Sequence, residues 1–466
     1  EEAMCMFKTM KLKGFSPNVV TYACILKACG SISSLATGRE IHVNILSEGL
    51  AKKVSIGNAL VDMYVKSGLL QKALEMFNEL SDRDAISWNT LIVGYVQHGP
   101  SEEALRCFKQ MQGNGVCPTS VTFVCVLKAC ANVGDIEEGQ RLHLDIVRKG
   151  FFETDVTVGN SLVDMYVKCG LVGIARVVFD KLPIKDVVSW NLLITGYIKH
   201  GYEEEALNCF DSMQREGIVP DAITHLGTLM GCGRLVAIFK GQETHAEIVK
   251  RGLVEEAVNN TLIDMYANCG MLMEAQHVFD SLSSNHHTIC SWTSLIAGYA
   301  QFGQDRIVHN LFNKMLNEGK GPDPIVFTIL LALCSHSGLT DTGQMYFERV
   351  IGDYDMLLTL EHHICMIDLL SRAGRLEMVI ALIKDLPFCA NSTLWHTMLN
   401  ASQRWGNMEL GTLAFQHALQ LDVEDASAYV CIRNMYAIQC DTKVLGGELT
   451  LIRTQTHRNT LKKKKL

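Results

Sequence analysis

The chain has 466 residues, 48% of them apolar and 20% charged, roughly two to three times the length that one hydrophobic core usually serves. Its 42 basic and 50 acidic residues give a net charge of −8, which argues against binding nucleic acid through bulk positive charge. Eight prolines and 37 glycines fit many helices separated by glycine turns and exclude disorder and collagen. No apolar run is long enough for a membrane helix, and 17 cysteines without paired spacing indicate reduced thiols in a core.

The first residues, EEAMCMFKTM, have the pattern of an amphipathic helix and not of a signal or transit peptide, so either none exists or the beginning is missing. Further along, apolar residues recur at helical spacing between glycines. The stretch WNLLITGYI predicts a first helix that Gly201 ends, and EEEALNCFDSMQREG predicts a second helix that Gly217 ends. Three glutamates in the first turn and Arg215 in the last turn of this second helix match its macrodipole. The pattern predicts a helical hairpin.

An internal repeat organises the whole chain. Trp88, Trp190 and Trp292 stand 102 residues apart, each in a segment of the form SW(N/T)xLIxGY, and prolines and cysteines recur at nearly the same interval. Each period holds three related hairpins of about 31 to 36 residues. A hairpin cannot bury its apolar face alone, so consecutive hairpins are expected to stack into an all-α solenoid. The tryptophans lie in the apolar stripe and are predicted to be buried between repeats.

The three kinds of segment have distinct signatures. A 35-residue hairpin ending in GxxPD alternates with VLxACxxxGxxxxGxxxH and NxLxDMYxKCGxxxxAxxVFDxL segments. This combination resembles the plant pentatricopeptide-repeat family, specifically its P-L-S subclass. The resemblance implies a right-handed α-solenoid superhelix of tandem helix-turn-helix repeats, with about 12 units and E motifs. Tetratricopeptide arrays are the nearest alternative, but they keep a single period and a different tryptophan pattern.

The resemblance also divides the chain. It implies a partial P repeat at 1–18, tandem L, S and P repeats at 19–288, a terminal P-L-S triplet at 289–391, a segment like the first E motif at 392–425, and a degenerate second E motif with a basic tail at 426–466.

In the pentatricopeptide-repeat family, RNA lies along the concave face and each repeat presents one base to the fifth residue of its first helix and to the last residue of the repeat. An asparagine amide offers a donor and an acceptor to a pyrimidine edge, whereas a hydroxyl suits a purine. Carried over position by position, the resemblance implies six RNA-binding pairs: Asn58 with Asp84, Asn89 with Thr119, Asn160 with Asp186, Asn191 with Asp221, Asn260 with Thr288, and Thr293 with Asp323.

Five of these pairs imply pyrimidines, and the Thr293 pair implies guanine. The L repeats place Ala23, Val124 and Leu226 at the fifth position, where no hydrogen bond to a base is possible, so they are expected to act as spacers. In the last S repeat, Ile364 and Asn391 carry little base preference. If repeat order follows the RNA 5′ to 3′, the target reads N-Y-Y-N-U-U-N-Y-G-N-N, where Y is a pyrimidine and N is undetermined.

Each of these residues has an alternative role. Asparagine also favours helix caps and turns, although its recurrence at one register favours base contact. Ile86 and Val188 resemble the family's apolar clamp on the bases, with core packing as the alternative. The pairs Arg148-Lys149 and Lys250-Arg251 could attract phosphate but lie at helix C-termini, where cations complement the dipole. The tail Lys462 to Lys465 is expected to be a solvated end.

No catalytic site is expected. Many relatives carry a zinc-dependent deaminase domain recognised by H-x-E and C-x-x-C. Only the first half occurs here, at His245 to Glu247, in the L-repeat register that also holds His42 and His143. The sequence therefore predicts neither a metal nor a cofactor.

The resemblance implies a sequence-specific binder of single-stranded organellar RNA in a mitochondrion or chloroplast. Its expected role is recognition of C-to-U editing sites, with a DYW-type deaminase protein and other editing factors as possible partners and with no membrane association. An RNA stability or splicing factor and a protein-binding scaffold remain alternatives.

Overall fold

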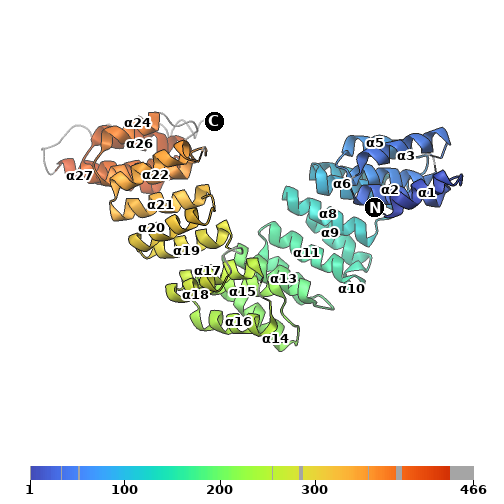
Figure 1. Cartoon of the computed structure of the whole chain (residues 1–466), viewed down its shortest axis with the longest axis horizontal. Helices are drawn as coiled ribbons and strands as arrows, with labels where there is room; N and C mark the ends of the chain where they lie inside the picture. Colours follow the sequence, from blue (N-terminus) through green and yellow to red (C-terminus); the bar gives the residue numbers. More distant parts are fainter. Residues whose placement is uncertain are drawn as a thin grey trace, which may run out of the picture. The chain divides into compact units, whose positions relative to one another are not determined.

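A computed structural model of the chain describes residues 2–32, 34–50, 53–253, 255–282, 287–354, 356–384 and 391–440. The predicted basic tail and most of the predicted second E motif lie outside these residues. Within them the chain forms 27 α-helices and no β-strand (Figure 1), as an all-α repeat solenoid requires. None of these helices is long and apolar enough to span a bilayer. The chain divides into two halves, residues 1–253 and 254–466.

The N-terminal half contains sixteen helices: α1 (Glu2–Leu12), α2 (Val19–Ser31), α3 (Leu35–Ser47), α4 (Val54–Lys66), α5 (Leu70–Asn78), α6 (Ala85–His98), α7 (Ser101–Gly113), α8 (Ser120–Val133), α9 (Ile136–Arg148), α10 (Phe151–Thr154), α11 (Val156–Lys168), α12 (Val172–Asp180), α13 (Val187–Lys199), α14 (Glu203–Arg215), α15 (Ala222–Leu235) and α16 (Ile238–Arg251).

The described part of the C-terminal half contains eleven helices: α17 (Glu256–Asn268), α18 (Leu272–Ser281), α19 (Ile289–Gln301), α20 (Asp305–Asn317), α21 (Pro324–Ser337), α22 (Thr340–Gly352), α23 (Leu360–Arg372), α24 (Leu376–Lys384), α25 (Ser392–Trp405), α26 (Met408–Leu421) and α27 (Ala426–Cys440).

The helices form hairpins as the sequence predicts. In the hairpin of α13 and α14, the first helix ends at Lys199 and Gly201 follows with a φ of 78°. The second helix ends at Arg215 and Gly217 follows with a φ of 75°, donating its amide hydrogen to the carbonyl of Gln214. Both glycines adopt the left-handed conformation that ends a helix at little steric cost. The expected helix boundaries are therefore confirmed here.

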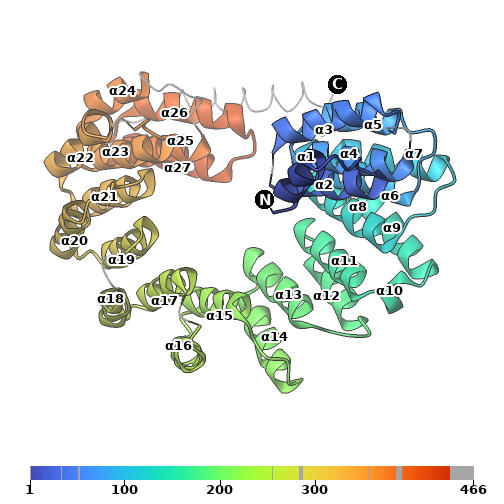
Figure 2. The same cartoon turned by 45° about the vertical axis from the view of Figure 1, so that its right-hand side comes forward.

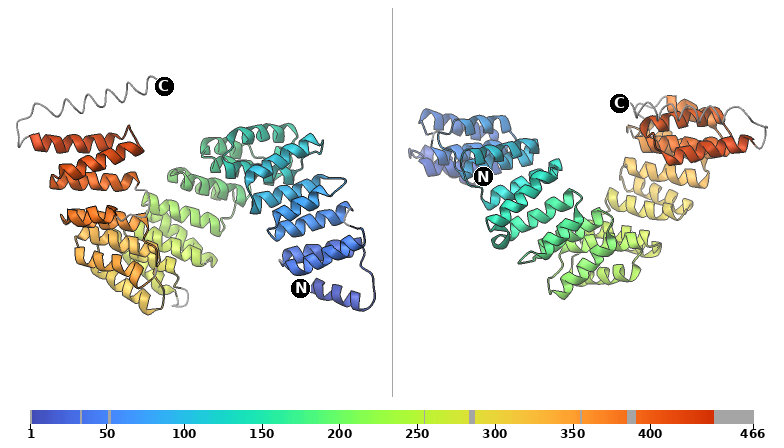
Figure 3. Two further views of the ribbon diagram at one scale, coloured as in Figure 1. Left: turned by 90° about the horizontal axis from the view of Figure 1, so that it is seen from above. Right: turned by 180° about the vertical axis from the view of Figure 1, so that it is seen from behind.

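Consecutive hairpins stack through their first helices. In the N-terminal half α2, α4, α6, α8, α11, α13 and α15 contact one another in series, and in the C-terminal half α17, α19, α21, α23, α25 and α27 do the same. The second helix of each hairpin packs on its own first helix, which gives each half two helical layers (Figures 2 and 3). Residues at one register of the first helices therefore form a row with one member per repeat.

The repeated tryptophans hold neighbouring hairpins together. Trp88, Trp190 and Trp292 are at most 1% exposed. Each ring packs edge-on against a phenylalanine from the second helix of the preceding repeat, with ring centroids 4.5 to 4.7 Å apart: Phe77, Phe179 and Phe279. These separations are typical of favourable aromatic pairs. The prediction that the tryptophans form an inter-repeat core is confirmed.

Cysteines contribute to the same core. The fifteen cysteines whose side chains the structure describes are not joined to one another by disulfides. Cys29, Cys130, Cys232 and Cys334 recur at the repeat interval and are at most 2% exposed. Burial raises the pKa of the Cys130 thiol to about 12 and that of Cys334 to about 11. These groups remain protonated and act as small apolar residues.

Candidate functional site

The predicted site residues occupy two recurring positions. The first is the fifth residue of a first helix, as for Asn58 in α4 and Asn191 in α13. The second is the N-cap of the next first helix, a position held by Asp84, Thr119, Asp186, Asp221, Thr288 and Asp323. The residues predicted to end the repeats are therefore helix caps, and the asparagines lie within helices. The alternative in which the asparagines act as helix caps is wrong.

Hydrogen bonds of 3.2 Å or less join four of the predicted pairs. Asn191 Nδ2 donates to Asp221 Oδ1 at 2.9 Å, and Asn89 Nδ2 donates to Thr119 Oγ1 at 3.0 Å. The Asn58–Asp84 and Asn160–Asp186 pairs are each joined at 3.2 Å. Each bond links a fifth residue to the cap of the following first helix. Two residues about thirty positions apart in the sequence thus form one polar unit.

A third residue, absent from the sequence prediction, completes these four sites. The hydroxyl of Ser87 donates to Asn58 Oδ1, and those of Thr122, Ser189 and Thr224 donate to Asn89, Asn160 and Asn191, at distances of 2.6 or 2.7 Å. All four hydroxyl residues are fully buried. They lie three positions after the cap, where a serine or threonine closes a reciprocal capping box. The spacing D/T-x-x-S/T is the sequence signal that could have identified them.

Each asparagine, its cap and its hydroxyl partner are called here a three-residue network. The network uses one of the two amide hydrogens of the asparagine and one of the two lone pairs of Oδ1. One donor and one acceptor remain, which is the combination that a pyrimidine edge can satisfy. Asn58 and Asn89 are half-buried, whereas Asn160 and Asn191 are only 7% exposed. A base could therefore meet only the outer edge of the amide at these last two positions.

The three aspartate caps that belong to these networks are held in the charged form. Partial burial by itself would raise the pKa of Asp84, but hydrogen bonds with Ser87 and Asn58 outweigh it and lower the pKa. The same balance, with burial opposed by hydrogen bonds from the corresponding partners, lowers the pKa of Asp186 and Asp221. An ionised carboxylate accepts only, so it fixes the asparagine with its amide nitrogen toward the cap.

The last two predicted pairs differ from the first four. Asn260 Nδ2 donates to Thr288 Oγ1 over a longer distance, 3.5 Å, while Ser291 donates to the backbone carbonyl of Thr288 and not to the asparagine. The Oδ1 atom of Asn260 is buried without a partner among the described residues.

Thr293 donates to the carbonyl of Ile289, and Asp323 accepts from the amide of Val326. No hydrogen bond joins Thr293 to Asp323 in the described part of the chain. Val326, at the third position after the cap, has no hydroxyl to bridge them.

Exposed apolar residues flank the networks. Ile86 and Val188, the second residues of α6 and α13, are 63% and 55% exposed. The same position is exposed in four other first helices, at Val20, Val121, Ile223 and Ile325. Core packing is therefore not their role. In the N-terminal half they form a row of β-branched side chains beside the caps, open to solvent.

The remaining candidates have structural partners. His42 Nδ1 lies 2.8 Å from the Tyr64 hydroxyl and His143 Nδ1 lies 3.0 Å from that of Tyr166, so this register joins the second helix of one hairpin to the first helix of the next. Burial lowers the pKa of His245, which shares the register. Across the described residues, no group of three or more His, Cys, Asp or Glu side chains is arranged to hold a metal.

Three of the four cations considered for phosphate contact have local partners. Arg251 pairs with Glu247, Arg148 approaches Asp145, and the Lys149 ammonium lies over the ring of Phe123.

Family models and relatives agree on the class of protein. The PPR repeat family model matches residues 83–132 and 185–234, the pentatricopeptide repeat domain model matches 1–31, and the PPR repeat model matches 58–84, 121–151, 260–286 and 290–319. A pentatricopeptide repeat-containing protein of Arabidopsis thaliana is 34% identical over 475 residues, covering 94% of this chain and 68% of that protein. A second, named mitochondrial, is 33% identical, with 94% and 70% covered. The chain belongs to the pentatricopeptide repeat family.

Other relatives and solved structures extend this picture. An Arabidopsis relative named chloroplastic is 32% identical, with 94% of this chain and 50% of that protein covered. The chain spans from about half to about 70% of the length of these relatives. The pentatricopeptide repeat protein PPR10, solved in complex with an 18-nt psaJ RNA element, aligns with a TM-score of 0.71 at 21% identity, over 82% of this chain and 57% of that one. PPR10 from maize aligns with a TM-score of 0.56 at 17% identity, over 99% and 76%. These likenesses establish the solenoid fold.

Proposed function

We propose that the chain binds single-stranded RNA in a sequence-specific manner, reading one base at each P or S repeat. The observation that carries this proposal is the recurrence of the three-residue network at one register of four first helices. Each network offers one donor and one acceptor at a fixed orientation, beside an exposed apolar residue against which a base could stack in the P repeats. The PPR10 structure in complex with RNA supports an RNA ligand for this fold.

The proposed target is a pyrimidine-rich tract. Asn58, Asn89, Asn160, Asn191 and Asn260, with their terminal residues, would favour pyrimidines, and Thr293 with Asp323 would favour guanine. Gel shifts test the proposal with an RNA of the sequence N-Y-Y-N-U-U-N-Y-G-N-N and with its complement. Preference for the first RNA is expected. Equal binding of both RNAs would remove the base-recognition role of these residues.

Exchange of one asparagine sharpens the test. In Asn191→Thr a hydroxyl replaces the amide, so the base preference at one position should move from uracil toward guanine while the other positions keep theirs. Asn208→Thr, at an exposed position of the second helix α14, is the matched control and should leave every preference unchanged. A uniform loss of affinity across sequences in Asn191→Thr would contradict a local code.

The finer proposal is that the protein selects C-to-U editing sites and recruits a DYW-type deaminase in trans, with the target cytidine a few nucleotides 3′ of the last S repeat. The P-L-S alternation and the E-like segment at 392–425 support this role, and relatives named mitochondrial and chloroplastic support an organelle. Disruption of the gene should abolish editing at one cytidine. Altered transcript ends with normal editing would favour RNA stability, and affinity for peptide without affinity for RNA would favour a scaffold.

A further inference from the structure

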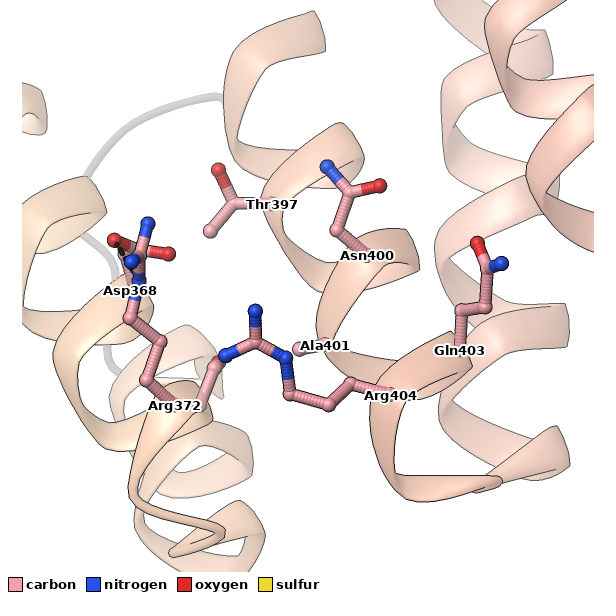
Figure 4. Close-up of a pocket in the computed structure, with 8 residues that line it drawn as sticks. Asp368, Arg372, Thr397, Asn400, Ala401, Gln403 and Arg404 are labelled. Carbon is pink, nitrogen blue, oxygen red and sulfur yellow. Dashed lines mark hydrogen bonds and ion pairs between the residues drawn. The ribbon is translucent and has the colours of Figure 1, made fainter.

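A polar pocket lies between α23 and α25 in the C-terminal half. It has a volume of about 540 Å³, and its charged lining residues are Asp368, Arg372 and Arg404. Thr397 and Asn400 contribute polar side chains to the same wall (Figure 4). Two arginines against one aspartate give the pocket an excess of one positive charge. The excess favours an anionic ligand, which is unusual in a chain whose net charge is −8.

The Arg372 charge is already neutralised by an ion pair within its own helix, and the same kind of pair recurs in the chain. In three first helices of S repeats, an aspartate at the ninth helical residue pairs with a cation at the thirteenth: Asp62 with Lys66 at 2.7 Å, Asp164 with Lys168 at 2.6 Å, and Asp368 with Arg372 at 2.8 Å. Residues four apart face each other on a helix, so these pairs are local and persist without a ligand. In each of these repeats the cation is therefore already paired with a carboxylate of its own helix.

Arg404 stands at the same register without such a carboxylate. In α25 the ninth residue is Asn400 and the thirteenth is Arg404. An amide cannot neutralise the guanidinium, and Arg404 forms no ion pair with any residue that the structure describes. Figure 4 shows its side chain extended toward α23, into the space between the two helices. The excess charge of the pocket therefore resides on Arg404.

Asn400 is oriented so that its amide group can contribute a second hydrogen-bond donor beside Arg404. Its Oδ1 atom accepts a weak hydrogen bond from the thiol of Cys431 at 3.5 Å. The amide nitrogen is left on the other side, and Figure 4 shows it directed toward Thr397. Two kinds of N–H donor thus line the pocket: a planar guanidinium and a carboxamide. This combination suits the tetrahedral oxygens of a phosphate.

The pocket also lies on the face where RNA is expected. Residues 5, 9 and 13 of a helix share one face because they are separated by four positions each. In α23 these are Ile364, Asp368 and Arg372, of which the first is the fifth-position residue of the last S repeat. The pocket therefore continues the proposed base-reading face by one to two helical turns.

We propose that this pocket binds a backbone phosphate of the RNA, just 3′ of the last base read, with Arg404 as its principal charge and Asn400 as a supporting donor. The inference rests on the proposed function. It assigns the E-like segment a direct RNA contact that carries no base preference, since a phosphate is the same at every nucleotide.

The test introduces into α25 the ion pair found in the S repeats. Asn400→Asp would place a carboxylate four residues before Arg404, where it would pair with Arg404 as Asp368 pairs with Arg372. Affinity for the target RNA, extended 3′ by several nucleotides, should fall about threefold to tenfold at low salt. The slope of log affinity against log salt should shrink by about 0.7, the value for one phosphate contact on a single strand. Arg404→Gln should give the same result, and Arg404→Lys should largely preserve the slope.

Matched controls separate the possible outcomes. Asn310→Asp adds the same charge on the exposed face of α20 and should leave the slope unchanged. Thermal unfolding of each variant verifies the fold. An unchanged slope in Asn400→Asp and Arg404→Gln, with base preference intact, would overturn the pocket while leaving the proposed function in place. Absence of RNA binding by the unmodified protein would instead overturn the proposed function. Inorganic phosphate could also bind the pocket and raise the thermal unfolding temperature while the variants leave RNA affinity unchanged. That result would identify a small-anion site and would overturn the inference.

Discussion

The four networks between Asn58 and Thr224 contrast with the two sites that follow in the sequence, around Asn260 and Thr293. In the first group the asparagine, the cap and the buried hydroxyl satisfy one another at 2.6 to 3.2 Å. At Asn260 the hydroxyl of Ser291 turns to a backbone carbonyl, and at Thr293 the fifth residue and the cap do not meet. The side chain that would meet the base is thus held in place by the cap that follows it and by a hydroxyl three residues further on. A fifth residue alone does not define a site.

The physical reason is the cost of leaving a buried polar atom without a partner. Oδ1 of Asn191 is satisfied by Thr224, whereas Oδ1 of Asn260 is buried and unpartnered among the described residues. An unsatisfied group of this kind costs about 1–3 kcal/mol. The unpartnered oxygen at Asn260 would gain most from an external donor, whereas the closed networks gain orientation before any ligand arrives.

The largest effect is expected when a closed network loses its asparagine. Asn191→Leu places at this position the residue type of Leu226, the fifth residue of α15, and it removes the amide that Asp221 and the buried Thr224 hydroxyl both bond. The free energy of unfolding should fall by about 1–3 kcal/mol, and the base preference at this position should disappear. Urea unfolding and binding to RNAs varied at one nucleotide measure the two effects. Asn208→Leu, on the surface of α14, should alter neither.

A second variant pair compares closed and open sites directly. Ser189→Ala removes the hydroxyl that holds Asn160 Oδ1, so it should weaken the uracil preference at that repeat and lower the free energy of unfolding by about 1 kcal/mol. Ser291→Ala removes a hydroxyl that bonds only within its own cap. It should therefore leave the preference at Asn260 unchanged. Equal effects of both substitutions on base preference would contradict the distinction between the two groups.

The open site at Thr293 can be rebuilt as a closed one. The double substitution Thr293→Asn with Val326→Thr supplies the asparagine and the hydroxyl that the cap Asp323 lacks. We expect a gain of about 0.5–1.5 kcal/mol in unfolding free energy and a shift of preference from guanine toward pyrimidine. Val326→Thr alone should be destabilising, because the valine is fully buried and the new hydroxyl would have no asparagine to bond. No shift of base preference in the double variant would show that the network is not the recognition element.

The smallest effect for each site is the pH dependence of the aspartate caps. Hydrogen bonds outweigh burial and lower the pKa of Asp84, Asp186 and Asp221 in the folded chain, so the unfolded chain binds protons more readily. Their contribution to stability is complete above the unfolded pKa of about 3.9 and is lost as the pH falls through the lower folded pKa. Urea unfolding between pH 7 and 3 should show this decline. Asp221→Asn keeps a capping side chain that does not titrate, so the free energy of unfolding should fall less steeply as the pH is lowered. An unchanged pH profile would contradict the contribution of this cap.

Much of the fold could be predicted because its signals are local and repeated. The helical period and the glycines after α13 and α14 set the hairpins, and the 102-residue spacing of tryptophans set the register. Family resemblance then paired each fifth residue with the next cap, although the site as a whole was predicted less completely. The sequence did not predict the four buried hydroxyl residues as part of the site, because a hydroxyl three residues after a cap is usually explained by helix capping alone. These residues are Ser87, Thr122, Ser189 and Thr224. The exposure of Ile86 and Val188 also depended on packing that a spacing pattern leaves open.

The amino-acid sequence by itself determined the repeated hairpin, because the hairpin follows from periodicity and from turns within one repeat, and the family resemblance added the positions of the paired residues. Only the tertiary structure decided which of the paired residues meet. That choice depends on atoms from two consecutive repeats, such as Asn160 and Ser189, approaching within hydrogen-bonding distance. It is made by the stacking of hairpins, which brings side chains about thirty residues apart into contact and which no local pattern specifies.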